Sequence, residues 1–389
     1  MTLSDVAVLI LAAMAAVGVV YQLGACVALV RFFGREMPVA RDLPADMAPK
    51  MHGVTLVKPL HGAEPRLAEN LATFLDQDTL AAVQMLCGVN TAQDAAASAV
   101  AALRASHPQA DIAFYPGPRL PGANGKMGNC AAMLPLARHD VLLLSDSDMV
   151  VERDYLARVV GALQQPGVGA VSCLYVGRGD SGLWSRIGAA MISWQTMPNM
   201  VVGMATGMAQ PCMGSTIALR RSTLDAIGGF ESLVDVLADD HAIGARVAAL
   251  GQKVVIPPML LVHAGAEGSA RALWRQHLRW AATVRDLAGP GHYGSVITHP
   301  LALSLLVVPF APLGGLFLVG AALIARIALA RVVNRLAPPP HLSLWALPVA
   351  DVFAFAIFCA SLFTRQIDWR GASLTMTGNG RIAPDGTRN

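Results

Sequence analysis

Two aspartates follow an apolar run in the middle of the chain, in the sequence LLLSDSD at residues 142–148. A buried strand that ends in Asp146 and Asp148 would place two carboxylates at the edge of a sheet. Carboxylate oxygens bind hard divalent cations such as Mg²⁺ and Mn²⁺, and such a cation can also bind a diphosphate. This spacing also occurs in ordinary solvated turns, so the hypothesis of a metal site at Asp146 and Asp148 depends on the residues around them.

A second acidic pair, Asp239 and Asp240, precedes a run of helical pattern at residues 241–250. Carboxylates at the start of a helix stabilise its dipole, which is the simpler interpretation of the pair taken alone. A carboxylate held by a rigid helix start can also accept the proton of an attacking hydroxyl group. The functional alternative is therefore a general base.

A basic and aromatic cluster surrounds the sequence QHLRW at residues 276–280. On a helix, Gln276, Arg279 and Trp280 share one face. The Arg guanidinium suits a phosphate, and the Trp ring offers a flat apolar wall. Such clusters also lie at membrane surfaces, with their charged ends in water. The pattern therefore predicts a phosphate-binding helix or a membrane-surface helix.

A glycine-rich turn at residues 122–129, GANGKMGN, carries Lys126. Its backbone amides and single ammonium group could contact a phosphate. It lacks the spacing of the phosphate loop of nucleoside-triphosphate hydrolases, which disfavours that class. His263, which follows an apolar run at residues 254–261, is either a metal ligand or a hydrogen-bonded core residue, and the pattern favours the core residue.

The composition indicates a membrane protein, since 54% of the 389 residues are hydrophobic, 14% are charged and the mean hydropathy is +0.50. Residues 6–30 contain no charge and exceed the roughly 20 apolar residues that a spanning helix needs. Asp5 precedes this run, whereas four basic residues follow it, which predicts a cytoplasmic location for the next segment. These basic residues are Arg31, Arg35, Arg41 and Lys50. A cleaved signal peptide is disfavoured, because no basic segment precedes the run.

The cysteines and the net charge exclude several classes. None of the six cysteines forms a C-x-x-C pair, so neither a zinc site nor a disulfide framework is expected. The net charge is only +3 and the chain has no basic block, which argues against a nucleic-acid partner. Lipids and small anions remain as expected partners.

Residues 51–290 are less apolar and alternate between short apolar runs and helix-like stretches, which predicts an α/β domain with a mainly parallel sheet and flanking helices. The expected strands are 54–57, 83–89, 112–115, 141–144, 168–175 and 254–261. The expected helices are 66–75, 94–106, 129–137 and 241–250.

Further apolar segments predict additional contacts with a membrane. Residues 184–209 are rich in Met but also polar, so they form either an interfacial segment or an ordinary core helix and loop. Residues 301–325 form either one kinked span or a hairpin, and residues 342–363 form another span. Three spans in total are favoured. The tail after Gly371 is expected to be disordered.

Taken in order, these motifs resemble the inverting, family-2-like glycosyltransferases with a GT-A fold. The closest resemblance is to the ceramide glucosyltransferase family, including its bacterial relatives associated with hopanoid biosynthesis. The motifs that carry the resemblance are residues 58–62 (KPLHG), 124–129, Asp146-Ser147-Asp148, Asp239-Asp240 and Gln276-x-x-Arg279-Trp280.

The resemblance implies a role for each matching residue. Asp146 and Asp148 would bind the metal and the diphosphate, and Asp240 would be the general base. The residues expected to hold the donor are Lys126, Asn129, Gln276, Arg279 and Trp280. Where the family carries a base-contacting aspartate, this chain has Val89-Asn90-Thr91-Ala92-Gln93-Asp94. Either Asp94 takes that role, or Asn90 and Thr91 bind the base through neutral hydrogen bonds.

The expected activity is transfer of glucose or N-acetylglucosamine from a UDP-sugar to a hydroxyl group of a membrane lipid, a hopanoid polyol or a ceramide, with Mg²⁺ or Mn²⁺ as cofactor. Ceramide-specific members tend to carry a His before the Pro that is Pro198 here, and Met197 favours another lipid. The alternatives are a processive polysaccharide synthase and a non-catalytic lipid-binding protein.

The expected organisation is a multi-pass protein of the bacterial inner, cytoplasmic membrane whose catalytic domain faces the cytoplasm. Its expected parts are a transmembrane anchor at residues 1–33, a GT-A domain at 50–290 with the interfacial segment 184–209, a transmembrane region at 296–365 and a tail at 366–389.

Overall fold

The computed structural model describes residues 2–36, 53–78, 82–210, 212–369, 372–378 and 380–384. The chain forms two compact units, which we call the sheet unit and the helix unit. The sheet unit comprises Glu36–Tyr175, Gln210–Ala264 and Gly380–Asn389, and the helix unit comprises Met1–Arg35, Val176–Ala209 and Gly265–Asn379. Arg41 and Lys50, on which part of the topology prediction depends, lie outside the described residues.

Seven strands of the sheet unit form one sheet in the order β3-β2-β1-β4-β8-β6-β9. Neighbouring strands are parallel except at β8, which is antiparallel to both β4 and β6. The strands are β1 (Val54–Pro59), β2 (Val83–Val89), β3 (Asp111–Pro116), β4 (Val141–Leu144), β6 (Val168–Ser172), β8 (Ile217–Arg220) and β9 (Lys253–Val255). The prediction of a mainly parallel α/β sheet is therefore confirmed.

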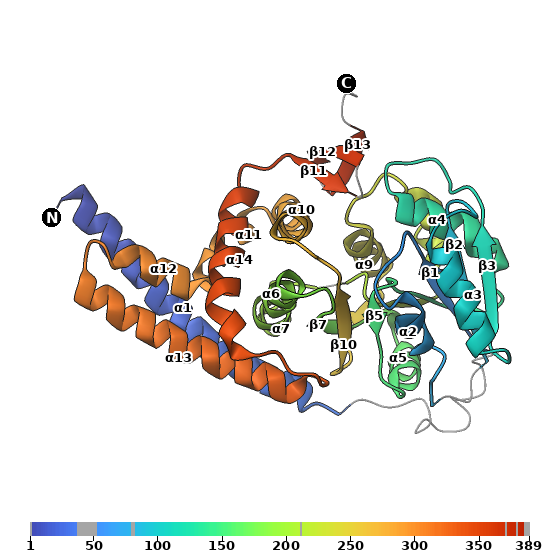
Figure 1. The fold of residues 1–389 in the computed structure, drawn as a ribbon, viewed down its shortest axis with the longest axis horizontal. Helices are drawn as coiled ribbons and strands as arrows, with labels where there is room; N and C mark the ends of the chain where they lie inside the picture. Colours follow the sequence, from blue (N-terminus) through green and yellow to red (C-terminus); the bar gives the residue numbers. More distant parts are fainter. Residues whose placement is uncertain are drawn as a thin grey trace. The chain divides into compact units, whose positions relative to one another are not determined.

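The sheet is buried on both faces, which explains why most positions of its strands are apolar. Along β4, Val141 and Leu143 contribute to one core cluster, and Leu142 and Leu144 to the other. Helices pack on both faces, as Figure 1 shows. One core includes α2 (Leu67–Ala72), α3 (Ala96–Ser106) and α5 (Tyr155–Leu163), and the other includes α4 (Gly125–Met133), α8 (Arg221–Ala226), η4 (Phe230–Leu233) and α9 (Asp239–Ala249).

Two predicted strands are each divided in the structure. Residues 168–175 form β6 and the start of β7 (Leu174–Gly179), along which the chain passes into the helix unit. Residues 254–261 form β9 and the start of β10 (Leu260–Gly265), because Pro257 and Pro258 cannot donate the hydrogen bonds of a strand ladder. Instead, β10 pairs antiparallel with β5 (Met149–Val150), directly after the D-x-D sequence.

The predicted helix at 129–137 begins earlier, at Gly125, and ends at Met133, where the 3₁₀ turn η2 (Leu134–Leu136) follows. It begins early because the side chain of Asn124 accepts a hydrogen bond from the backbone N–H of Met127 at 3.0 Å. Lys126 therefore lies in the first turn of α4 and not in a loop.

In the helix unit, α1 (Leu3–Phe33), α12 (Pro300–Val307) and α13 (Pro312–Leu336) pack together, and α14 (Leu347–Ser361) packs against α10 (Ala270–Ala288). Within the residues that the structure describes, three helices are long and apolar enough to cross a membrane, at Ser4–Phe33, Pro312–Leu336 and Leu344–Ser361. Shorter elements are α6 (Leu183–Met191), the π-helical turn η3 (Ile192–Thr196), α7 (Met197–Ala205), α11 (Pro290–Gly294), η5 (Ser295–Thr298) and η6 (Leu344–Ala346).

One expectation about the C-terminal part was correct only in part, and another was wrong. The apolar run at 301–325 breaks between α12 and α13, which pack together as in the hairpin alternative, but α13 continues past the expected end to Leu336. Arg326 is accommodated there because its guanidinium pairs with Asp351 inside the unit. The tail is not wholly disordered, since β11 (Gln366–Trp369) pairs antiparallel with β12 (Ala372–Gly378). The strand β13 (Arg381–Pro384) lies against residues 235–237 of the sheet unit, where Ile382 N–H donates to the Asp235 carbonyl. Residues 385–389 lie outside the described residues.

Candidate active site

The backbone of Gly214 connects the two aspartate pairs that the sequence analysis singled out. The Asp146 N–H donates to the Gly214 carbonyl at 3.2 Å, and the Gly214 N–H donates to Asp240 Oδ2 at 3.1 Å. Gly214 precedes β8, and β8 is hydrogen-bonded to β4, which ends just before Asp146. The order of strands therefore brings together two motifs that are more than ninety residues apart in the sequence.

Lys126 joins the same cluster from α4. Its Nζ lies 2.7 Å from Asp146 Oδ1 and 3.4 Å from Asp239 Oδ2. The Asn124 side chain, which caps α4, also donates to the Val236 carbonyl at 2.6 Å, and this bond ties the start of α4 to the segment before α9. The glycine-rich turn, the D-x-D sequence and the second acidic pair thus form one cluster within the sheet unit.

The charges of the cluster depend on one another. Burial lowers the pKa of Lys126, but Asp146 and Asp239 outweigh this effect and hold it well above its usual value. Burial raises the pKa of Asp146, and Lys126 opposes that rise. Desolvation and the adjacent Asp239 carboxylate raise the pKa of Asp240 to about 6. A carboxylate with such a pKa suits general base catalysis near neutral pH.

Asp148 is held by His263, whose Nε2 lies 3.1 Å from Asp148 Oδ2. Burial raises the pKa of Asp148, but interaction with His263 lowers it, and the net result is a pKa below the usual value. The other oxygen, Asp148 Oδ1, is buried and has no hydrogen-bond partner among the described residues. A buried carboxylate oxygen without a partner is costly, so this oxygen is suited to a ligand or a cation.

The residues fit a divalent cation that is shared with a bound diphosphate. Asp146 and Asp148 offer oxygen ligands only, the type that Mg²⁺ and Mn²⁺ prefer. In the part of the chain that the structure describes, no three His, Cys, Asp or Glu side chains gather into a complete metal cage. One or two carboxylates are nevertheless the usual protein contribution where substrate phosphates supply further ligands.

Two further residues support the D-x-D sequence. His263 lies within β10 as a buried, hydrogen-bonded residue, which agrees with the favoured interpretation of the sequence. Lys58, at the end of β1, is completely buried, and its Nζ donates to Ser145 Oγ at 3.0 Å and to the Asp146 carbonyl at 3.2 Å. Burial lowers the pKa of Lys58 to about 7. The sequence analysis assigned Lys58 no role, although it opens the first of the quoted motifs.

The carboxylate of Asp94 is engaged at both oxygens. Its Oδ1 accepts hydrogen bonds from the N–H groups of Gly62 and Ala96, and its Oδ2 lies 3.3 Å from His61 Nδ1. It therefore fastens the loop after β1 to the start of α3. By contrast, Asn90 Oδ1 is buried and accepts no hydrogen bond within the described residues.

Asn129 is 3% exposed and donates to the Gly88 carbonyl at 2.8 Å, so it holds α4 against β2. Gln276, Arg279 and Trp280 lie on α10 in the helix unit, and all three are partly buried. The Trp280 ring lies 5.0 Å from the ring of His277. The clustered residues of the sheet unit are therefore Lys126, Asp146, Asp148, Asp239 and Asp240, whereas the α10 residues belong to the other unit.

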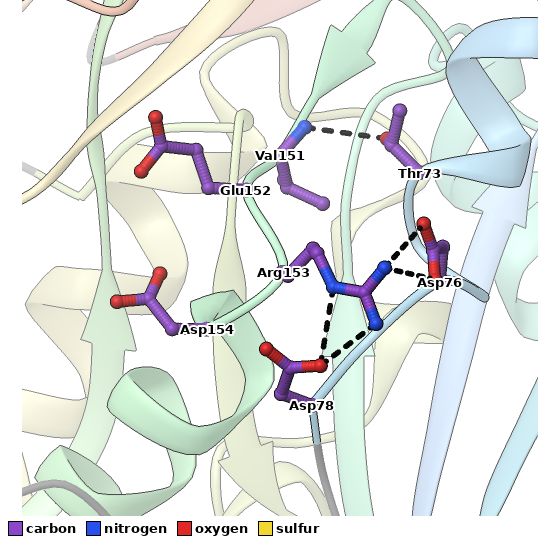
Figure 2. A pocket seen from close by; sticks show the side chains of 7 residues that line it. All are labelled: Thr73, Asp76, Asp78, Val151, Glu152, Arg153 and Asp154. Carbon is purple, nitrogen blue, oxygen red and sulfur yellow. Dashed lines mark hydrogen bonds and ion pairs between the residues drawn. The ribbon is translucent and has the colours of Figure 1, made fainter.

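A surface depression elsewhere on the sheet unit contains none of the predicted site residues (Figure 2). In its wall, Arg153 forms ion pairs with Asp76 and Asp78. These side chains are well exposed, so the pairs contribute little to stability. The residues that line the depression are Thr73, Asp76, Asp78, Val151, Glu152, Arg153 and Asp154.

Comparison with known families identifies the chain. The model of the family described as "Glycosyl transferase family 21" matches residues 10–382. The chain belongs to glycosyl transferase family 21. The predicted resemblance to ceramide glucosyltransferases is confirmed by this membership.

Curated relatives of this family 21 chain include ceramide glucosyltransferase 1 of Caenorhabditis elegans, 23% identical over 235 residues, which are 60% of this chain and 50% of the relative. A ceramide glucosyltransferase of Komagataella phaffii is 27% identical over 148 residues, 36% of this chain and 28% of the relative. The chain thus spans half the length of the first relative and less than a third of the second.

Among solved structures, this family 21 chain is similar to a mannosyltransferase from Pyrobaculum calidifontis in complex with GDP-Man and Mn²⁺. The TM-score is 0.50 at 22% identity, and the match covers 90% of this chain and 97% of the other. The likeness confirms the predicted GT-A fold.

Proposed function

We propose that the chain transfers a hexosyl group, glucose or N-acetylglucosamine, from a UDP-sugar to a hydroxyl group of a membrane lipid, a hopanoid polyol or a ceramide. The observation that carries this proposal is the cluster around Gly214, in which Asp240 has a pKa of about 6 and Asp148 has a buried, unpartnered oxygen. An acid–base group and a diphosphate site side by side are what glycosyl transfer needs.

Asp240 acts as the general base of a single displacement. The lipid oxygen forms a bond to the anomeric carbon while the bond from that carbon to the diphosphate oxygen breaks. The hydroxyl proton passes to Asp240, and the nucleoside diphosphate leaves with the bonding electrons. Because attack and departure occur on opposite faces of the sugar, the anomeric configuration inverts.

Asp146 and Asp148 would hold the divalent cation, which when bound neutralises charge on the departing diphosphate. His263 keeps Asp148 ionised, and Lys58 donates a hydrogen bond to the backbone carbonyl of Asp146. Lys126 supplies a further positive charge beside the carboxylate of Asp146. These residues of the chain therefore orient and stabilise the leaving group.

Asn90 is proposed to recognise the nucleotide base, because Asp94 has both oxygens engaged whereas the buried carbonyl oxygen of Asn90 accepts no hydrogen bond within the described residues. Asn129 contributes by holding α4, which carries Lys126, in place. Gln276, Arg279 and Trp280 remain proposed donor-binding residues on the basis of the family resemblance.

A lipid acceptor is supported by three helices apolar enough to cross a membrane and by relatives named ceramide glucosyltransferases. The bilayer would deliver such an acceptor laterally. The proposed location is the bacterial cytoplasmic membrane, with the sheet unit on the cytoplasmic side, since Arg31 and Arg35 follow the first apolar helix.

The test incubates membranes containing the chain with radiolabelled UDP-glucose or UDP-N-acetylglucosamine, and compares wild type with Asp148→Ala. Label in extracted lipid that depends on Asp148 supports the proposal and names the sugar. Label found only in material that organic solvent does not extract would favour a polysaccharide synthase. The absence of label from both donors, with Mn²⁺ and mixed lipid acceptors present, would contradict the proposal.

A further inference from the structure

An ion pair lies inside the helix unit, between two of the helices that are apolar enough to span a membrane. Arg326 of α13 donates from Nε to Asp351 Oδ2 at 2.7 Å and from a terminal nitrogen to Asp351 Oδ1 at 2.5 Å. The two residues are 1% and 7% exposed. At 1.5 Å per residue, Arg326 lies roughly 15 Å from the end of α13 at Leu336, within a helix whose length and hydropathy suit a membrane span.

The remaining donor group of Arg326 joins two more elements. Its second terminal nitrogen donates to Gln22 Oε1 of α1 at 3.0 Å and to the carbonyl oxygen of Trp194 at 2.7 Å. Gln22 is itself 1% exposed and donates to the Thr298 carbonyl at 3.0 Å. One guanidinium group therefore connects α1, α14 and the π-helical turn η3 to α13.

The network contacts an irregular stretch of backbone at the π-helical turn η3, through the carbonyl of Trp194. A π-helical turn shifts the hydrogen bonds of a helix to more distant partners, and such turns are frequent at functional sites. Both side chains at its centre are also fixed, since Trp194 Nε1 donates to Asn334 Oδ1 at 3.2 Å and Gln195 Nε2 donates to Thr298 Oγ1 at 2.7 Å. The turn is thus held by α13 and by η5.

An ion pair in an apolar interior is costly, and replacing it by apolar residues of similar size is often neutral for stability. Ionisable residues inside the apolar helices of a membrane protein generally serve function. The pair therefore calls for an explanation other than stability, and its bond to the Trp194 carbonyl supplies one.

We propose that Arg326 and Asp351 are positioning residues that fix the buried turn Ile192–Thr196, and that the segment 183–208, which this turn holds in place, contributes to the surface that receives the lipid acceptor. The second part rests on the proposed function. Segment 183–208, which contains the turn, begins and ends with exposed apolar side chains, at Leu183 and Met208, as a lipid-facing segment would.

The test uses the full chain in detergent with added lipid acceptor. Asp351→Leu alone leaves Arg326 unpaired and is expected to lower the yield of folded protein. The double variant Arg326→Met with Asp351→Leu removes both charges while keeping the volume, so it should fold, with a Tm close to that of wild type. Arg331→Met, an exposed arginine on the same helix, is the matched control.

In the double variant, the KM for the lipid acceptor should rise about tenfold or more, because small displacements of positioning groups are expensive, while the KM for the donor stays within about twofold. Hydrogen exchange of a peptide covering residues 192–205 should accelerate in the double variant and not in Arg331→Met.

A folded double variant with wild-type acceptor KM and unchanged exchange would overturn the proposal. If exchange accelerates but the wild-type chain transfers no sugar to lipid, the positioning role stands and the proposed function fails. If exchange is unchanged while wild type is active, the function stands and the positioning role fails.

Discussion

Two backbone N–H donors orient the Asp240 carboxylate, and its burial and one neighbouring carboxylate set its pKa. The N–H groups of Gly214 and His241 hold its oxygens, while desolvation and Asp239 favour its protonated form. Its identity as a candidate base could be taken from the sequence, because a doubled aspartate before a helix is visible there. Its elevated pKa could not, since the largest cause is the burial of Asp240 in the folded chain.

The pH dependence of transfer follows from this carboxylate. Only the ionised form accepts a proton, and Asp240 is half ionised near pH 6, so kcat/KM should fall about tenfold per pH unit below 6 and level off above it. Asp240→Asn should remove this acid limb from whatever activity remains. Rates measured from pH 4.5 to 8.5 provide the check, and a flat profile for the wild type would argue against Asp240 as the base.

The same raised pKa predicts that replacing Asp240 by a neutral residue does not destabilise the fold near neutral pH. A carboxyl group whose pKa is raised on folding contributes stability below its unfolded pKa of 3.8, and loses that contribution as pH rises through about 6. At pH 7.5, Asp240→Asn should therefore have a free energy of unfolding at least equal to that of wild type. Chemical denaturation of both proteins tests this, and a strongly destabilised variant would show a structural role instead.

Gly214 is a proposed site residue that could not be selected from the sequence, since nothing in its neighbours shows that Asp146 and Lys126 surround it. A Cβ at Gly214 would lie 2.9 Å from Asp146 Oδ2 and 3.0 Å from Lys126 Nζ. We expect Gly214→Ala to displace these side chains and to lower kcat by about tenfold or more. Gly268→Ala, where a Cβ meets no atom within 4 Å, is the control and should keep wild-type kcat.

At the scale of elements, the strands were the most predictable feature, because a sheet buried on both faces requires continuous apolar runs such as residues 141–144. Their order was not predictable. The antiparallel insertion of β8 between β4 and β6 depends on side chains far apart in the sequence, and it is this insertion that places Gly214 beside Asp146.

The start of α4 differs from the predicted one because the Asn124 side chain caps the helix four residues earlier. Its side chain caps the helix and also binds the Val236 carbonyl, so Asn124→Ala should lower the free energy of unfolding by about 1–2 kcal/mol and weaken donor binding through Lys126. Denaturant titration and the donor KM give the two readouts.

Thr2→Ala provides the matched control for this prediction. Thr2 also caps a helix, α1, but it is exposed and lies in the helix unit. The Thr2→Ala variant should leave the donor KM unchanged. An equal change of donor KM in both variants would mean that loss of a cap, and not the placement of Lys126, is responsible.

For the whole molecule, the length and hydropathy of the apolar runs were enough to predict three helices that could cross a membrane. The end of the second of these helices was not predictable, because a segment with three arginines, residues 326–335, is not typical of a span. The partner that makes Arg326 tolerable, Asp351, lies in the following helix.

Three helices long and apolar enough to cross a membrane predict that the chain behaves as an integral membrane protein. It should stay in the membrane pellet after washing at pH 11, which strips proteins held by surface charge, and dissolve only in detergent. Immunoblotting of pellet and supernatant tests this. Release at pH 11 would mean that the apolar helices lie on the membrane without crossing it.

The most direct test of the central claim is the initial rate of sugar transfer from the labelled donor to extracted lipid at pH 7.5, for Asp240→Asn beside Asp225→Asn. Asp225 is an exposed carboxylate of the same unit, so its variant should keep the wild-type rate. Asp240→Asn should lose at least about a hundredfold, the usual contribution of a general base. Wild-type transfer by a folded Asp240→Asn protein would contradict the assignment of the Gly214 cluster as the active site.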